Sequence, residues 1–239
     1  MEKAKKVKLF IGLFYLILLG LFLYFFFSKF SLQEITSYEF IKNNREYFEE
    51  LKQSNYYLLI VLFFIFTIFW VLVGGFGSPL GIFAGFIFGK WVGIILLIFG
   101  MSIGATGLYV FANFFLKEYV REKFLDKYQN LGKKFQKSEF LYLLIYRFVG
   151  GIPFAIANLL PIIFNVRFRN YFFGTFFGIL PSLFIIASLG HGFEKTVQRN
   201  DQSISFIELI LLPEIYVPII CFLLLMLISI LARKIFYKN

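Results

Sequence analysis

The stretch that decides the fold is Val73-Gly74-Gly75-Phe76-Gly77-Ser78-Pro79, which interrupts an uncharged run from Gln53 to Gly89. A related stretch, Val149-Gly150-Gly151-Ile152-Pro153, interrupts a second apolar segment. Glycine adopts backbone conformations closed to other residues and proline cannot continue a helix, so both stretches predict a chain reversal or an unwound break. Paired Gly/Pro breaks in corresponding positions of two halves are typical of inverted repeats in membrane proteins.

The chain around these breaks is strongly apolar. Of its 239 residues, 59% are hydrophobic and 16% are charged, whereas a soluble domain carries charge at about a quarter of its positions. A helix needs about 20 apolar residues to cross a hydrocarbon core of about 30 Å. We therefore predict an all-α integral membrane protein with two oppositely oriented re-entrant helical hairpins in an inverted repeat, plus about four transmembrane helices.

The predicted order of these segments follows the uncharged runs. The transmembrane helices are expected at 9–27, 91–116, 170–190 and 215–232, and the hairpins at about 56–90 and 140–164. This divides the chain into a retained N-terminal anchor with an interfacial segment (1–55), a core with both hairpins (56–192), and a loop with a C-terminal transmembrane helix (193–239).

The distribution of basic residues sets the predicted orientation. With both termini inside, the inner segments hold 16 Lys and Arg (4 before 9–27, 7 in 117–138, 2 in 167–169 and 3 at the C-terminus), and the outer segments hold 6. Cytoplasmic loops of membrane proteins carry the excess of Lys and Arg. The net charge of +10 thus indicates topology and headgroup contact, and we expect no nucleic-acid partner.

Regularly spaced glycines follow each break. Gly in a helix costs about 1 kcal/mol relative to Ala, and in lipid the compensating benefit is close approach of two helices. Packing alone is the favoured interpretation, and a sliding surface for a substrate is the alternative. The glycines assigned to this role are Gly81, Gly85, Gly89, Gly93, Gly104, Gly174 and Gly178.

Arg147 is the main candidate site residue, because it lies three positions before the second break with apolar residues on both sides. An Arg at the centre of a membrane costs about 2.5–3.5 kcal/mol on insertion scales and needs a partner, water or an anionic ligand. Its planar fork suits a phosphate. We expect Asn158, and less specifically Lys90, to assist it. The alternative is that Arg147 only bonds backbone carbonyls freed at the broken helix.

The sequence offers little else that could carry chemistry. All 14 acidic residues fall outside the predicted membrane segments, and one His and one Cys cannot build a metal site. His191 lies at a predicted membrane boundary, where we expect an interfacial role. We therefore expect no enzymatic activity, no metal and no cofactor.

Two sets of residues together resemble the core of the DedA superfamily. In the first half the resemblance is carried by Pro79 to Gly89, Gly93 and Gly104-Ala105. In the second half it is carried by a pattern R…P-F…N…T-x-x-G-x-x-P, which falls on Arg147, Pro153-Phe154, Asn158, Thr175, Gly178 and Pro181. The chain most resembles the SNARE-associated Golgi protein branch, whose shared core is called the VTT domain, over roughly 56–192.

The resemblance implies two inverted re-entrant hairpins, with Pro181 among the packing residues, and the movement of phospholipids or polyprenyl phosphates between leaflets. The bacterial DedA branch often carries a Glu near the first break, where this chain has Ser78-Pro79, which argues against a proton-coupled cycle. We expect a translocator of anionic lipids, either a scramblase or a lipid-phosphate flippase, in a bacterial cytoplasmic membrane. A structural or assembly protein and a small-solute or ion channel are the alternatives, and a homo-oligomer stays open.

Overall fold

The computed structural model describes residues 45–75, 77–124, 135, 137–149 and 154–199, together with single positions in the two terminal segments. Every regular element in this part of the chain is a helix, which confirms the all-α prediction. The predicted crossings at 9–27 and 215–232, apart from single positions, and the second break with Gly150, Gly151 and Pro153 lie outside the described residues.

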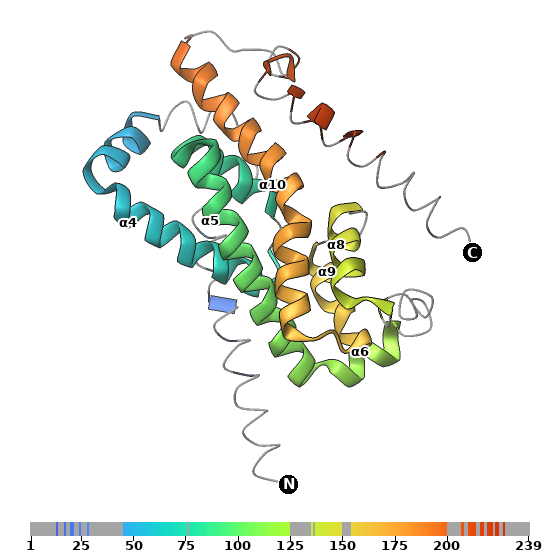
Figure 1. The fold of residues 1–239 in the computed structure, drawn as a ribbon. Coiled ribbons are helices and arrows are strands. Elements are labelled where there is room, and N and C mark those ends of the chain that lie inside the picture. Colours follow the sequence, from blue (N-terminus) through green and yellow to red (C-terminus); the bar gives the residue numbers. More distant parts are fainter. Residues whose placement is uncertain are drawn as a thin grey trace.

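The first half of the fold is a helix, a tight turn and a second helix (Figure 1). Helix α4 spans Arg45–Leu72 and is kinked at Asn55, and α5 spans Gly77–Phe115. Between them, the Gly74 N–H donates to the Val71 carbonyl (2.9 Å) and the Gly75 N–H to the Trp70 carbonyl (2.8 Å). This bonding and the φ of 82° at Gly74 match a Schellman cap, which ends a helix with glycine in the left-handed region.

Gly89 divides α5 into an arm, residues 77–88, and a long helix, residues 90–115. Its φ of 74° and ψ of 171° lie in a region that is essentially open only to glycine. The arm folds back along α4, because Phe88 at its end lies 5.2 Å from Phe63 and 6.2 Å from Tyr56 between ring centroids. The first break is therefore a helical hairpin with its mouth near Tyr56 and Phe88.

The second half begins with α6 (Lys117–Phe124) and repeats the pattern with shorter pieces. Helix α8 spans Glu139–Val149, α9 spans Phe154–Leu159, and the 3-10 helix η2 spans Leu160–Phe164. The Phe135 ring stacks on Phe164, with centroids 4.8 Å apart, so η2 ends beside the segment that precedes α8. The second long helix, α10, spans Phe168–Arg199 and contains Pro181.

The two long helices run antiparallel to each other at the centre of the molecule (Figure 1). Three aromatic pairs along their length fix this direction, because the residue numbers rise in α5 and fall in α10. The pairs and their centroid distances are Trp91–Phe184 at 5.9 Å, Phe99–Phe176 at 5.0 Å and Tyr109–Tyr171 at 4.2 Å.

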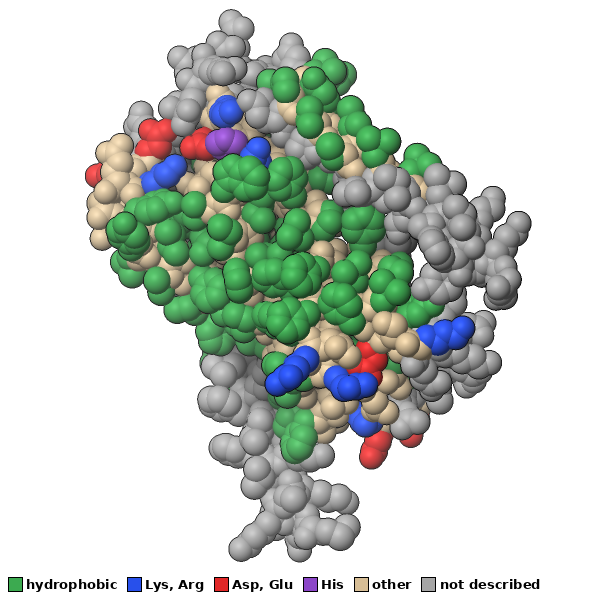
Figure 2. Space-filling model, viewed as in Figure 1, with side chains coloured by type: hydrophobic (Ala, Val, Ile, Leu, Met, Phe, Trp, Pro, Cys, Tyr) green, Lys and Arg blue, Asp and Glu red, His purple; other side chains and the backbone are tan. Residues whose placement is uncertain are grey.

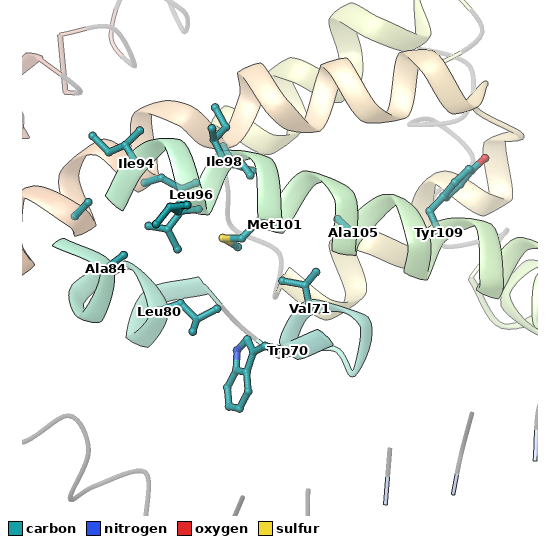
Figure 3. Packing of buried hydrophobic residues seen from close by; sticks show 14 of the residues in the cluster. Trp70, Val71, Leu80, Ala84, Ile94, Leu96, Ile98, Met101, Ala105 and Tyr109 are labelled. Carbon is teal, nitrogen blue, oxygen red and sulfur yellow. The ribbon is translucent and has the colours of Figure 1, made fainter. Parts of the chain in front are cut away.

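Glycines allow each long helix to approach the first helix of its own hairpin. Gly100 and Gly104 of α5 lie against Thr67 and Val71 of α4, and Gly174 and Gly178 of α10 lie against Leu143 and Arg147 of α8. A Cβ at these positions would collide with the facing helix. Figure 3 shows the first of these seams, with Val71, Met101 and Ala105 directed into the space between the helices.

Other glycines join the two halves. Gly81 and Gly85, in the return arm of α5, lie against Ile186 and the Ala187 carbonyl of α10, while Gly190 of α10 lies against the Ile82 carbonyl. Gly93 packs on the backbone of Ala84 within its own half. Gly89 differs from these, because the nearest atom to a Cβ there would be His191 Nδ1 at 4.0 Å. Gly89 is required for its backbone conformation, whereas the others are required for space.

The surface has the distribution expected of a membrane protein. Figure 2 shows a broad band of apolar side chains, with charged side chains gathered above and below it. Among the described residues, three helices are long and apolar enough to cross a membrane: α4 from Glu49, α5, and α10 as far as Lys195. Exposed apolar residues such as Trp91 and Val110 are stable facing lipid and would be costly facing water.

Candidate functional site

A buried polar cluster surrounds Arg147 in the last turn of α8. Arg147 is only 7% exposed, although it is a charged residue of a kind almost never fully buried without a partner. Its Nη2 donates to Asn158 Oδ1 at 2.6 Å and to the Tyr171 hydroxyl at 2.9 Å. The cluster thus joins α8 to α9 and to the start of α10. The C-terminal turn of a helix also favours a positive charge electrostatically.

Tyr171 connects this cluster to the other half of the molecule. Its hydroxyl accepts a hydrogen bond from Arg147 and lies 3.3 Å from both the Oδ1 and the main-chain oxygen of Asn158. Its ring is stacked on Tyr109 of α5 at an interplanar angle of 16°. The Tyr109 hydroxyl donates to the Val166 carbonyl at 2.5 Å. Both long helices therefore hold the cluster in place.

The cluster has more hydrogen-bond donors than acceptors. Arg147 Nε and Nη1 and Asn158 Nδ2 are buried and make no hydrogen bond with any described residue. No described carboxylate forms an ion pair with Arg147; its guanidinium carbon lies 5.4 Å from the Phe154 ring and 5.6 Å from the Tyr171 ring. Each unfilled buried donor costs about 1–3 kcal/mol. An anion with several acceptor oxygens would fit this set of donors.

The hydrogen bonds of Arg147 within the described chain go to side chains. Neither is to a backbone carbonyl of a broken helix, which was the alternative considered from the sequence. Gly178 brings α10 close enough to bury Arg147, because a Cβ at position 178 would meet the Arg147 side chain and the Leu144 carbonyl. About six turns of α10 follow Gly178 at about 3.6 residues per turn, with Pro181 in the first of them.

The equivalent position in the first half is apolar. Val71 contacts Gly104 of α5 as Arg147 contacts Gly178 of α10. Val71 is fully buried in the hydrophobic core beside Trp70 and Ala105. The two halves therefore share this packing contact, but among the described residues a charged side chain is buried only in the second half.

The structure brings together Arg147 and Asn158 but not Lys90. The Lys90 ammonium lies 5.1 Å from the Trp91 ring and 5.5 Å from the Phe184 ring, at the mouth of the first hairpin.

The residues at the tip of the first hairpin lie in different environments. A Cβ at Gly75 would meet Trp70, and a Cβ at Gly77 would meet Met101. Pro79 lies in the first turn of α5, where its missing N–H costs nothing.

His191 belongs to a second polar group near the Lys90 end. Its Nδ1 lies 3.0 Å from Glu194 Oε2, and Lys52 Nζ of α4 lies 3.5 Å from Glu194 Oε1. This group links α4 to α10 across the mouth of the first hairpin. Within the described residues, no group of three His, Cys, Asp or Glu side chains could hold a metal ion.

Glu139 closes the mouth of the second hairpin. Its Oε2 accepts hydrogen bonds from the Arg167 N–H at 3.0 Å and from Asn170 Nδ2 at 2.6 Å, and its Oε1 lies 3.5 Å from Arg167 Nε. Burial raises the pKa of the Glu139 carboxyl, but these hydrogen bonds and the Arg167 charge outweigh burial and hold that pKa below its usual range.

Tyr171 and Tyr109 were not selected from the sequence as site residues. Each lies within an apolar run of a long helix, where an aromatic residue is ordinary. Only the antiparallel pairing of α5 and α10 places one on the other, and only the return of α9 places Asn158 next to Tyr171.

Comparison with known proteins identifies the core. Residues 76–192 match the VTT domain family. The chain carries a VTT domain. The match extends over the return arm of the first hairpin, the long helix of α5, the elements from α6 to η2, and α10 as far as Gly192. It confirms the resemblance to the DedA superfamily and its SNARE-associated Golgi protein branch. The protein is a multi-pass membrane protein.

Three curated proteins are similar to parts of the chain. A transmembrane protein 41 homolog of Dictyostelium discoideum is 27% identical over 62% of this chain and 46% of its own length. A transmembrane protein 41 homolog of Caenorhabditis elegans is 26% identical over 60% of each chain. The protein YqeD of Bacillus subtilis is 26% identical over 46% of this chain and 53% of its own length. The matched region spans about half of these relatives, and no solved structure is similar to the chain.

Proposed function

We propose that this protein translocates anionic lipids between the leaflets of a membrane, as a scramblase or a lipid-phosphate flippase, and is not an enzyme. The observation that carries the proposal is the Arg147 cluster: a buried guanidinium in which two nitrogens, Nε and Nη1, make no hydrogen bond, a neighbouring amide nitrogen that makes none, and no described carboxylate to neutralise the charge. A phosphate would supply both the acceptors and the charge.

The depth of the cluster supports this role. Arg147 packs on Gly178, which lies about 15 Å along α10 from Phe168 at about 1.5 Å per residue. Arg167 and Arg169, both exposed, mark the membrane surface at that end of α10. In a hydrocarbon core of about 30 Å, the Cβ of Arg147 therefore lies near the midplane, and its guanidinium, which reaches the Tyr171 hydroxyl, lies between that depth and the surface. A lipid phosphate has a high energy inside the hydrocarbon, so a fixed positive charge there lowers the barrier.

Short helices support the re-entrant arrangement. The return arm of the first hairpin, residues 77–88, is about 18 Å long, and the 11 residues of α8 are about 17 Å long, at about 1.5 Å per residue. Neither can cross a core of about 30 Å. Each therefore enters the membrane and turns back. Because the long helix that follows each hairpin runs antiparallel to the other, we infer that the two halves form an inverted repeat.

Lys90 serves the same process at a different place. Its ammonium lies at the mouth of the first hairpin over two aromatic rings, where it would attract headgroups from one leaflet toward the central cluster.

We also propose that the protein resides in a bacterial cytoplasmic membrane with both termini inside. The predicted topology has 16 basic residues on the inner side and 6 on the outer side, which supports this orientation. The similarity to a Bacillus subtilis protein supports the location.

The test is fluorescent-lipid transfer between leaflets in proteoliposomes that contain either phosphatidylglycerol or a polyprenyl phosphate probe. Wild-type protein should transfer an anionic lipid, and Arg147→Gln should lose transfer. Arg169→Gln removes an exposed charge at the start of α10 and should retain transfer. The melting temperatures of both variants in detergent show whether either has a folding defect. Arg147→Lys keeps the charge and is the second variant to test if Arg147→Gln is unstable.

The outcomes separate the alternatives. Full transfer by folded Arg147→Gln would disprove the headgroup role. No transfer of either probe by correctly inserted wild-type protein would favour a structural or assembly function, in which the cluster only ties α8, α9 and α10 together. Ion conductance in planar bilayers without lipid transfer would favour a channel.

A further inference from the structure

A groove runs along the outer surface between the end of α5 and the beginning of α10. Its volume is about 680 Å³, within the range of about 300–1,000 Å³ typical of small-molecule sites. Ile103, Gly107, Val110 and Phe114 line one wall, and Phe168 and Phe172 line the other. The wall residues of α5 are spaced by four, three and four positions, so they form a single stripe along the helix.

The groove is apolar over most of its length and polar at one end. Asn113 lines it near that end, and Asn113 Oδ1 is buried without a hydrogen-bond donor among the described residues. Lys117, the first residue of α6, follows Phe114 by three positions along the chain. The Leu116 N–H donates to the Ala112 carbonyl at 2.7 Å, so helical bonding continues to the edge of Lys117.

Positive charge gathers at this end of the groove. Lys117 forms no ion pair with a described carboxylate. Arg167 and Arg169 flank the groove residue Phe168 and are exposed. The nearby acids are fewer: Glu118 is exposed, and Glu139 is bonded to Arg167 and Asn170. The site thus combines an apolar channel within the membrane with a basic end at the membrane surface.

A second groove lacks this combination. It is formed by Ile60, Val61 and Phe64 of α4 with Ile95, Leu96 and Phe99 of α5, and its volume is about 340 Å³. No charged or polar side chain lines it. It provides an internal reference for an apolar surface that any lipid chain can cover.

We propose that the groove between α5 and α10 binds one acyl chain of an anionic phospholipid whose phosphate is held by Lys117. The stripe from Ile103 to Phe114 accommodates the chain over about 16 Å at about 1.5 Å per residue. Lys117 provides a charge-assisted contact to the phosphate, and Asn113 faces the glycerol region. This lipid is distinct from the one at Arg147, and its binding is independent of whether the protein translocates lipids.

The test measures lipid binding to the purified full chain by native mass spectrometry, with dioleoyl phosphatidylglycerol and dioleoyl phosphatidylcholine as probes of equal chain length. Wild-type protein should retain one phosphatidylglycerol in preference to phosphatidylcholine. Lys117→Gln should weaken that preference by about tenfold, and Lys117→Arg should restore it. Val110→Trp, at a position 47% exposed, should fill the groove and remove the tightly bound lipid.

Val61→Trp is the matched control, because Val61 is 51% exposed and lies in the groove without a basic end. This variant should bind lipid as wild type does. Unchanged phosphatidylglycerol preference in Lys117→Gln, or equal loss in Val61→Trp and Val110→Trp, would overturn the proposal. A crosslinking experiment with Val110→Cys in a Cys221→Ser background tests for another occupant of the groove. A crosslink to a second copy, or to another segment of the same chain, would also overturn the proposal. If the wild-type protein transfers no lipid between leaflets, this binding result still stands, because the two experiments are independent.

Discussion

Tyr171 stacks on Tyr109 with ring centroids 4.2 Å apart, and the two hydroxyls point to different partners. The Tyr171 hydroxyl is bonded to Arg147, and the Tyr109 hydroxyl is bonded to the Val166 carbonyl. The stack joins the two antiparallel long helices at the level where the second hairpin opens. One ring therefore supports the buried charge, and the other supports the segment that leads into α10.

This arrangement makes Tyr171→Phe informative. The substitution keeps the stack but leaves a further Arg147 N–H without an acceptor, so we expect the free energy of unfolding in mixed micelles to fall by about 1–3 kcal/mol. Lipid transfer should fall as well, since Arg147 loses one of two groups that orient it. Tyr57→Phe, at a residue 83% exposed, should change neither quantity. Wild-type stability in Tyr171→Phe would contradict the role assigned to this hydrogen bond.

Gly178 is expected to tolerate no side chain. Alanine there would collide with the Arg147 side chain and the Leu144 carbonyl, and overpacking of this kind costs about 1–3 kcal/mol. We expect Gly178→Ala to lower the melting temperature and displace Arg147. Gly20→Ala is the control, because nothing lies within 4 Å of a Cβ at Gly20 and Ala favours a helix over Gly by about 1 kcal/mol. Equal melting temperatures for the two variants would argue against close packing at Gly178.

Gly89 should be intolerant for a different reason. Its φ of 74° and ψ of 171° place a side chain in a strained region that costs about 1–3 kcal/mol, although there is space around it. Asn tolerates the ordinary left-handed helical region but not this one. We therefore expect Gly89→Asn to destabilise the protein as much as Gly89→Ala, as measured by thermal unfolding. Rescue by Asn would mean that the backbone at this break is helical and left-handed.

The Glu139 carboxylate should make stability depend on pH. Its folded-state pKa is lowered, so its contribution is fully present above the unfolded-state pKa, about 4.3, and is lost as the pH falls through the folded-state value. We expect Glu139→Gln to melt below wild type at pH 7, with the difference closing below about pH 4. A difference that stays constant between pH 7 and pH 3 would exclude the ionised carboxylate as the source.

The sequence alone predicted the class of the fold and the places where the chain breaks. Long uncharged runs specify membrane helices because lipid cannot hydrogen-bond a backbone or solvate a charge. The Gly74-Gly75 turn follows from local geometry, since only glycine readily takes the left-handed conformation that ends α4. Arg147 could be selected in the same way, because an Arg in an apolar run is costly wherever it packs. The orientation of the chain and the inverted repeat are still predictions.

Only the tertiary structure decided which residues meet Arg147. Asn158 was predicted beside it, but Tyr171 comes from another helix, and Lys90 lies at the mouth of the other hairpin. The glycine spacing predicted close helix packing but not the partners, and it did not distinguish Gly89, which breaks the helix, from Gly85, which packs against Ala187. Spacing within one helix records which residues share a face. Which face meets which helix depends on the antiparallel pairing of α5 and α10, and that pairing exists only when the whole core is packed.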